Sequence, residues 1–146
     1  MREEGSTGPA DDPARPGPLL APRPWLSVDG TAVAAVEVAT SRRTRARGLL
    51  GRTGVDGALV LAPASSVHTF AMAFPIDVAF CRRTDRPGAF LVDAVRTLPP
   101  SRMTRPRIRA RMVIEAEAGA FSRWGLVRGS RVEIVELGRQ RLSARG

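Results

Sequence analysis

Apolar side chains occupy every second position of the segment FAMAFPIDVAF, residues 70–80. The alternating residues are Phe70, Met72, Phe74, Ile76, Val78 and Phe80. Because successive side chains of a β-strand point to opposite faces, this period of two predicts that all six share one face of a sheet. Pro75 cannot donate a ladder hydrogen bond, so we expect two strands that meet at a bend, or one kinked edge strand.

Short apolar stretches separated by turn residues recur along the rest of the chain. Residues 40–51 are predicted to form a short helix, and residues 118–124 a helical turn that ends at Gly125. Strands are predicted at residues 32–39, 57–62, 90–95 and 131–137. Several short strands with frequent turns and only one or two short helices favour a mainly β fold, a β-sandwich or barrel.

The length of 146 residues suits one domain. Residues 1–24 are rich in Pro, Gly, Asp and Ser and lack apolar periodicity, so they are expected to be a disordered tail. We assign residues 25–138 to a single β domain and expect the basic tail, residues 139–146, to fray.

Four arginines alternate with other residues late in the chain: Arg105, Arg107, Arg109 and Arg111. A helix would scatter them around its axis, whereas a strand would align them about 7 Å apart on one face. We therefore predict a strand with an outward basic row. Such a row could bind phosphates or an acidic protein surface, or it could simply discourage edge-to-edge strand pairing.

The excess of basic over acidic residues bears on which kind of partner the chain could bind. All 23 basic residues are Arg and the formal net charge is +9; residues 31–146 alone carry 20 Arg against nine acids. The absence of Lys suggests a GC-rich coding bias, which weakens any functional interpretation of the charge. Charge alone supports nonspecific, salt-sensitive nucleic-acid binding. No aromatic residue interleaves with the arginine row, which argues against a stacking platform for single strands.

Cys81 and His68 are the only residues of their kinds, so the chain can form neither an intramolecular disulfide nor a structural zinc site from them. No sequence motif calls for a cofactor or a metal. The first residues lack the features of a secretion signal, and no apolar run is long enough to span a membrane. A cytoplasmic location is expected. The Cys81 thiol, at the end of an apolar strand, is expected to be buried and inert.

Asp77 is the most suggestive single residue, because a carboxylate among small and apolar neighbours needs partners. It is either a pocket acid or an acceptor of backbone N–H bonds at the bend after Pro75. His68 has the chemistry of a general base, and Glu115 lies in a later apolar strand. No nucleophile motif or paired-carboxylate spacing accompanies them, so no catalytic residue is assigned. The candidate ligand-binding residues are His68, Met72, Asp77, Glu115, Arg105, Arg107, Arg109 and Arg111.

Three blocks of the chain together resemble the bacterial and archaeal family called domain of unknown function 192, over roughly residues 32–137. They are ARGLLGR (46–52), FAMAFPIDVAF (70–80) and VIEAEAG (113–119) followed by GLVRGS (125–130). Many family members have Trp where this chain has Ala71, and Asp where it has Ser130. The resemblance implies a jelly-roll-like β-sandwich or barrel and brings no established activity.

The leading hypothesis is a non-enzymatic binding or accessory domain that engages a protein partner or a small anionic ligand. It would use the face near residues 70–77 or the arginine row. One alternative is a hydrolase-like enzyme with a pocket at His68, Asp77 and Glu115, which requires those side chains to converge. Another is nonspecific nucleic-acid binding through the arginine row.

Overall fold

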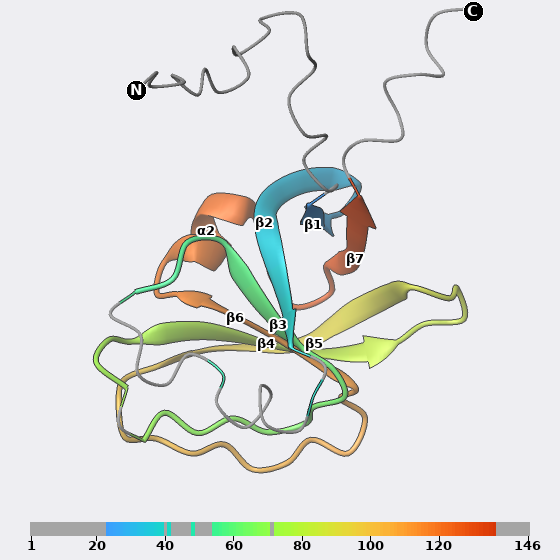
Figure 1. Ribbon diagram of the computed structural model, residues 1–146. Helices are drawn as coiled ribbons and strands as arrows, with labels where there is room; N and C mark the ends of the chain where they lie inside the picture. Colours follow the sequence, from blue (N-terminus) through green and yellow to red (C-terminus); the bar gives the residue numbers. More distant parts are fainter. Residues whose placement is uncertain (1–22, 40, 42–47, 49–53, 71, 137–146) are drawn as a thin grey trace, which may run out of the picture.

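The computed structural model describes residues 23–39, 41, 48, 54–70 and 72–136. Within these residues, seven strands close into a barrel in the order β1-β2-β3-β6-β4-β5-β7 (Figure 1). The strands are β1 (Pro24–Val28), β2 (Thr31–Ala39), β3 (Ala58–Leu61), β4 (Ile76–Arg83), β5 (Ala89–Leu98), β6 (Met112–Glu117) and β7 (Arg131–Glu136), and the helix α2 spans Ala120–Trp124. The mainly β prediction is confirmed, and of its two alternatives the fold is the barrel.

Neighbouring strands pair antiparallel except β2 and β3, which run parallel. The barrel closes because β7 pairs with both β1 and β5. Gly57 lies just before β3, and its φ of +81° is one that other residues rarely adopt. A Cβ at Gly57 would lie 2.4 Å from the carbonyl oxygen of Ala35 on β2. Glycine is therefore required for β3 to begin this close to β2.

The interior of the barrel forms one apolar core. All seven strands contribute small or branched side chains to it, among them Val60, Ala79, Ile114 and Val132, each with no exposed surface. Phe121 of α2 packs against the same core. The alternating pattern of each strand thus turns one face inward, and the helix covers part of this core.

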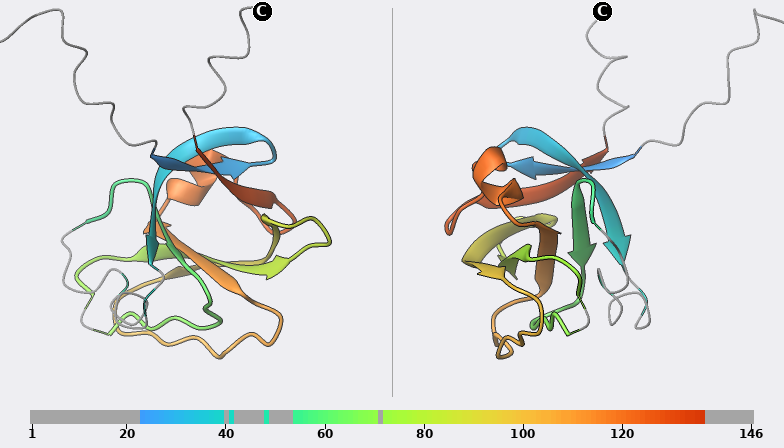
Figure 2. Two further views of the ribbon diagram at one scale, coloured as in Figure 1. Left: turned by 45° about the vertical axis from the view of Figure 1, so that its right-hand side comes forward. Right: turned by 90° about the vertical axis from the view of Figure 1, so that its left-hand side faces the viewer.

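A second apolar core lies on the outer side of β3, β4, β5 and β6. Two loop segments, residues 63–70 and 99–111, extend over this side and run side by side along one end of the molecule (Figures 1 and 2). Single backbone hydrogen bonds join them, from Thr69 N to Arg102 O (2.7 Å), from Thr104 N to Val67 O (2.8 Å) and from Arg107 N to Ser65 O (2.9 Å). We call these two segments the ledge.

Most of the predicted elements are confirmed. The four predicted strands correspond to β2, β3, β5 and β7, and α2 ends at Gly125, whose φ is +66°. The short strand β1 was not predicted. The predicted helix at 40–51 lies outside the described residues except for Ser41 and Gly48, as do residues 139–146 and all but the end of the predicted N-terminal tail.

The run 70–80 is a strand only in its second half, because β4 begins at Ile76 directly after Pro75. Ile76, Val78 and Phe80 do share one buried face, on the outer core, as predicted. Phe70, in contrast, is 50% exposed on the ledge. The period of two therefore continues through a loop that is not part of the sheet.

The predicted arginine strand is wrong, because β6 begins only at Met112. Arg105, Arg107 and Arg109 lie in the ledge, together with Arg111 at its end. Pro106 has no N–H to donate. This stretch makes isolated bonds to other segments instead, such as Arg111 N to Cys81 O (2.8 Å). The arginines consequently do not form an aligned row.

Candidate functional site

Part of the ledge and the outer side of β5 enclose a hollow of about 450 Å³ that carries three arginines. It is lined by Phe80, Arg96, Leu98, Thr104, Arg105, Pro106 and Arg107. Two of its arginines belong to the group singled out in the sequence. The third, Arg96, does not, because its position on β5 gives no hint that the ledge folds beside it. We call this the basic hollow.

Packing fixes the walls of the basic hollow. The guanidinium carbon of Arg107 sits 4.9 Å from the centre of the fully buried Phe80 ring, a cation–π contact. Arg96 lies opposite Val78 in the β4–β5 ladder and thus on the outer face. The hydroxyl of Thr104 accepts the Val67 N–H (2.9 Å) and donates to the Val67 carbonyl (3.2 Å). The sheet thereby fixes the backbone of Arg96, and the ledge fixes the backbone of Arg107.

The charged side chains that line the basic hollow are all positive. Residues 94–111 contain six Arg and no Asp or Glu. Within the described part of the chain, the ion pairs involve Arg82, Arg86 and Arg123, and none reaches the arginines of the basic hollow. Phe80, Leu98 and Pro106 add an apolar wall, which lowers the local dielectric constant. The arrangement can bind an anion that carries an apolar part.

The other two arginines of the predicted row lie outside the basic hollow. Arg111 turns back to the ledge, where its Nη1 donates to the carbonyls of Ile108 (2.7 Å) and Ala110 (3.0 Å). It also lines a smaller hollow of about 300 Å³ beside Pro63. Arg109 is exposed to solvent. Arg107 lines both hollows, Arg105 only the basic hollow, Arg111 only the smaller one and Arg109 neither.

The structure does not bring together His68, Asp77 and Glu115. Asp77 pairs with Ala116 in the β4–β6 ladder and faces the barrel interior, whereas Glu115 pairs with Val78 and faces outward. His68 is exposed on the ledge, with its ring stacked on Phe70 at a centroid distance of 5.7 Å. The two carboxylates project from opposite faces of the sheet, which does not provide the convergence that a hydrolase-like pocket requires.

Asp77 is 4% exposed, and both of its oxygens are hydrogen-bonded. Oδ1 accepts the Thr97 hydroxyl (2.7 Å), and Oδ2 accepts the N–H groups of Gly119 (3.0 Å) and Phe121 (3.1 Å). The two N–H donors belong to the turn that opens α2 and not to the bend after Pro75, and Thr97 belongs to β5. The geometry supports a structural role for the Asp77 carboxylate, in which it joins the helix to the start of β4.

Glu115 and Met72 are also buried. Glu115 is 5% exposed, and its Oε2 lies 3.3 Å from the position that a Cβ on Gly48 would occupy. Met72 is 8% exposed and packs in the outer core, as its apolar neighbours do. Neither side chain lines the basic hollow.

Burial, and to a smaller extent the nearby negative charge of Asp93, together raise the pKa of the Cys81 thiol from 9.0 to about 12. The thiol is fully buried in the inner core. At neutral pH it is protonated and a poor nucleophile, in agreement with the expectation of an inert cysteine.

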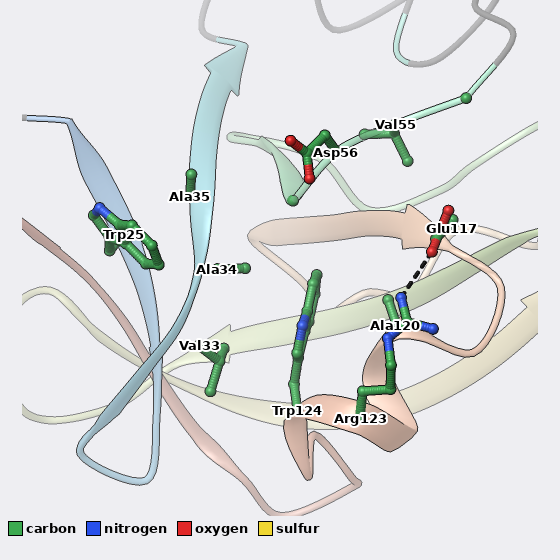
Figure 3. Close-up of a pocket in the computed structure, with 12 residues that line it drawn as sticks. Trp25, Val33, Ala34, Ala35, Val55, Asp56, Glu117, Ala120, Arg123 and Trp124 are labelled. Atoms are coloured by element: carbon green, nitrogen blue, oxygen red, sulfur yellow. Dashed lines mark hydrogen bonds and ion pairs between the residues drawn. The ribbon is translucent and has the colours of Figure 1, made fainter.

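A third hollow, of about 740 Å³, was not anticipated from the sequence. It lies between β1, β2, the segment before β3 and α2, and it includes both tryptophans of the chain, Trp25 and Trp124. Figure 3 shows the two indoles on either side of the β2 residues that line it. Asp56 lines the same hollow, as does the ion pair between Arg123 and Glu117 (2.7 Å). The two tryptophans are far apart in sequence, so no local pattern could have revealed this tryptophan hollow.

The described residues contain no group of three or more His, Cys, Asp or Glu side chains that could hold a metal ion. Among the same residues, no helix has the length and apolar character needed to cross a membrane.

Comparisons with known proteins agree with the fold. The model of the family DUF192, described as an uncharacterized ACR, matches residues 25–134. A crystal structure from Sinorhizobium meliloti, described as that of a proposed transcription regulator, is 20% identical with a TM-score of 0.63 and covers 77% of this chain and 92% of its own. A protein of unknown function from Novosphingobium aromaticivorans is also 20% identical, with a TM-score of 0.58, and covers 88% of this chain and 99% of its own. None of the curated proteins is a significant match.

Proposed function

The chain belongs to the uncharacterised DUF192 family, and we propose that it is a binding domain for an anionic ligand. The proposed site is the basic hollow. The observation that carries the proposal is that Arg96, Arg105 and Arg107 line one hollow and have no carboxylate partner among the described residues.

Guanidinium groups suit this role because they bind carboxylates and phosphates through paired N–H donors. In the hollow they adjoin apolar surface from Leu98 and Pro106, so an anion with an aliphatic or aromatic portion gains from both kinds of contact. The contact with Phe80 holds Arg107 in place before any ligand arrives. That preorganisation lowers the entropy lost on binding.

Isothermal titration calorimetry with two probe anions, inorganic phosphate and benzoate, tests the proposal. The variant R96S/R105S/R107S should bind at least about tenfold more weakly than wild type, since each charge-assisted hydrogen bond contributes about 1.5–3 kcal/mol. The matched control is R23S/R83S/R128S, which removes the same charge from arginines outside the hollow. Equal losses in both variants would mean that only net charge matters, and the proposal would fail.

The tryptophan hollow supports a second candidate, the binding of a methylated ammonium group. Indole faces attract such cations, and Asp56 has no partner among the described residues with which to share its charge. Because both tryptophans line this hollow, intrinsic fluorescence reports on it directly.

Titration with tetramethylammonium should give a saturable fluorescence change that tert-butyl alcohol, a neutral molecule of similar shape, does not produce. Replacing Asp56 with Asn should weaken the cation several-fold by removing the unpaired charge. If the neutral molecule binds equally well, or if D56N has no effect, the hollow is not a cation site.

A further inference from the structure

The outward face of the ledge carries large apolar side chains that nothing in the described structure covers. Phe70 is 50% exposed, Met103 72% and Ile108 91%. Exposed apolar side chains of this size on one segment often mark a contact with another molecule. The backbones of His68 and Met103 form a β-bridge, which brings the segments that carry Phe70 and Met103 together.

This exposure is built into the ledge and is not a sign of poor packing. In the segment 67–70, Val67 and Thr69 turn inward and are 7% and 0% exposed, whereas the residues between and after them turn outward. The Thr69 hydroxyl accepts the Arg102 N–H (2.8 Å) and donates to the Pro99 carbonyl (2.8 Å). The ledge is thus anchored on its inner side while it presents apolar groups on its outer side.

Exposed arginines flank Met103 and Ile108 along the chain. Arg102, Arg105 and Arg109 are exposed in the same segment, and no acidic residue lies between positions 94 and 111. A surface that combines protruding apolar side chains with a field of positive charge is complementary to an anionic lipid bilayer, whose headgroups are negative and whose interior is apolar.

We propose that the ledge docks on an anionic membrane surface. Phe70, Met103 and Ile108 enter the interface, and the basic hollow binds the phosphate of a lipid headgroup. This inference rests on the proposed anion site and identifies the source of its ligand. Nucleic acid offers the same charge, but it offers no apolar layer for Ile108 and Met103.

The position of the ledge suits such docking. It lies at one end of the molecule, while β1 and β7, the first and last described strands, lie at the opposite end (Figures 1 and 2). The described part of the chain therefore leaves the ledge face open to a flat surface.

Vesicle flotation of the full chain tests the proposal. Wild type should bind vesicles of phosphatidylcholine with roughly 30% phosphatidylglycerol, should not bind pure phosphatidylcholine, and should be released by high salt. The variant F70S/M103S/I108S alters only exposed side chains and should fold normally by circular dichroism. It should lose about tenfold or more in vesicle affinity yet retain phosphate binding in calorimetry.

The outcomes separate this inference from the proposed function. If F70S/M103S/I108S binds vesicles as wild type does, or if wild type binds phosphate but no vesicle, docking is refuted and the anion site stands. If wild type binds neither, both proposals fail. If the same salt concentration releases the apolar variant and the wild type from DNA, and neither protein binds vesicles, nucleic acid is the favoured partner and docking is overturned.

Discussion

Both oxygens of the buried Asp77 carboxylate have hydrogen-bond donors within the fold. Its two oxygens accept three hydrogen bonds, from Thr97, Gly119 and Phe121, and the last two come from the turn that opens α2. Since α2 packs against the inner core, the carboxylate links the sheet to the helix. The sequence identified Asp77 as a residue that needs partners, but the donors lie more than 40 positions away for two of the three bonds, so they could not be predicted.

Replacing Asp77 with Asn should lower the free energy of unfolding by about 1–3 kcal/mol, because a neutral amide accepts the two N–H bonds more weakly. Urea denaturation followed by circular dichroism measures this loss. Anion binding at the basic hollow should be unchanged under conditions in which the variant is folded. A variant that is as stable as wild type but has lost ligand binding would show that Asp77 is a site residue instead.

The buried Cys81 thiol should make the free energy of unfolding fall as the pH rises above 9. Folding raises the thiol pKa from 9.0 to about 12, so between these values the thiol ionises in the unfolded chain but not in the folded one. The stability that the neutral thiol provides is complete below pH 9 and is lost as the pH rises toward 12. The free energy of unfolding of wild type should therefore fall over this range relative to C81A. Parallel pH profiles for the two proteins would contradict the buried assignment.

At the scale of elements, periodicity predicted strands well and failed where proline interrupts a strand. Short apolar stretches between turn residues located β2, β3, β5 and β7, and alternation located the buried face of β4. The same alternation in the ledge comes from loops that turn side chains alternately toward and away from the outer core, without a continuous ladder. Pro75 and Pro106 were the available signals. The basic hollow could be predicted only in part, since Arg96 joins it through the β4–β5 pairing.

The ledge should be sensitive to the loss of one hydroxyl. Thr69→Val keeps the shape of the side chain but leaves the Arg102 N–H and the Pro99 carbonyl without their partner. We expect a loss of about 1–3 kcal/mol and faster amide hydrogen exchange at residues 101–104. The control is Thr84→Val, which removes similar bonds in the partly exposed β4–β5 turn, where water can replace them. Equal effects of both changes would contradict a buried anchor at Thr69.

At the scale of the whole molecule, the barrel separates the residues that hold the sheet together from the residues of the proposed anion site. The inner core and the Asp77 link to α2 hold the closed sheet together, while the ledge covers the outer core and concentrates positive charge on one end. Stability and ligand binding can therefore be altered by different substitutions. The variant R96S/R105S, which keeps the contact between Arg107 and Phe80, should unfold at nearly the same urea concentration as wild type.

The most direct test of the anion site is an NMR titration of the ¹⁵N-labelled protein with inorganic phosphate. We expect the largest shifts on the amides of Arg96, Thr104, Arg105 and Arg107 and on the guanidinium groups of the basic hollow. Shifts centred on the tryptophan hollow or around Asp77, or no saturable shift at all, would contradict it.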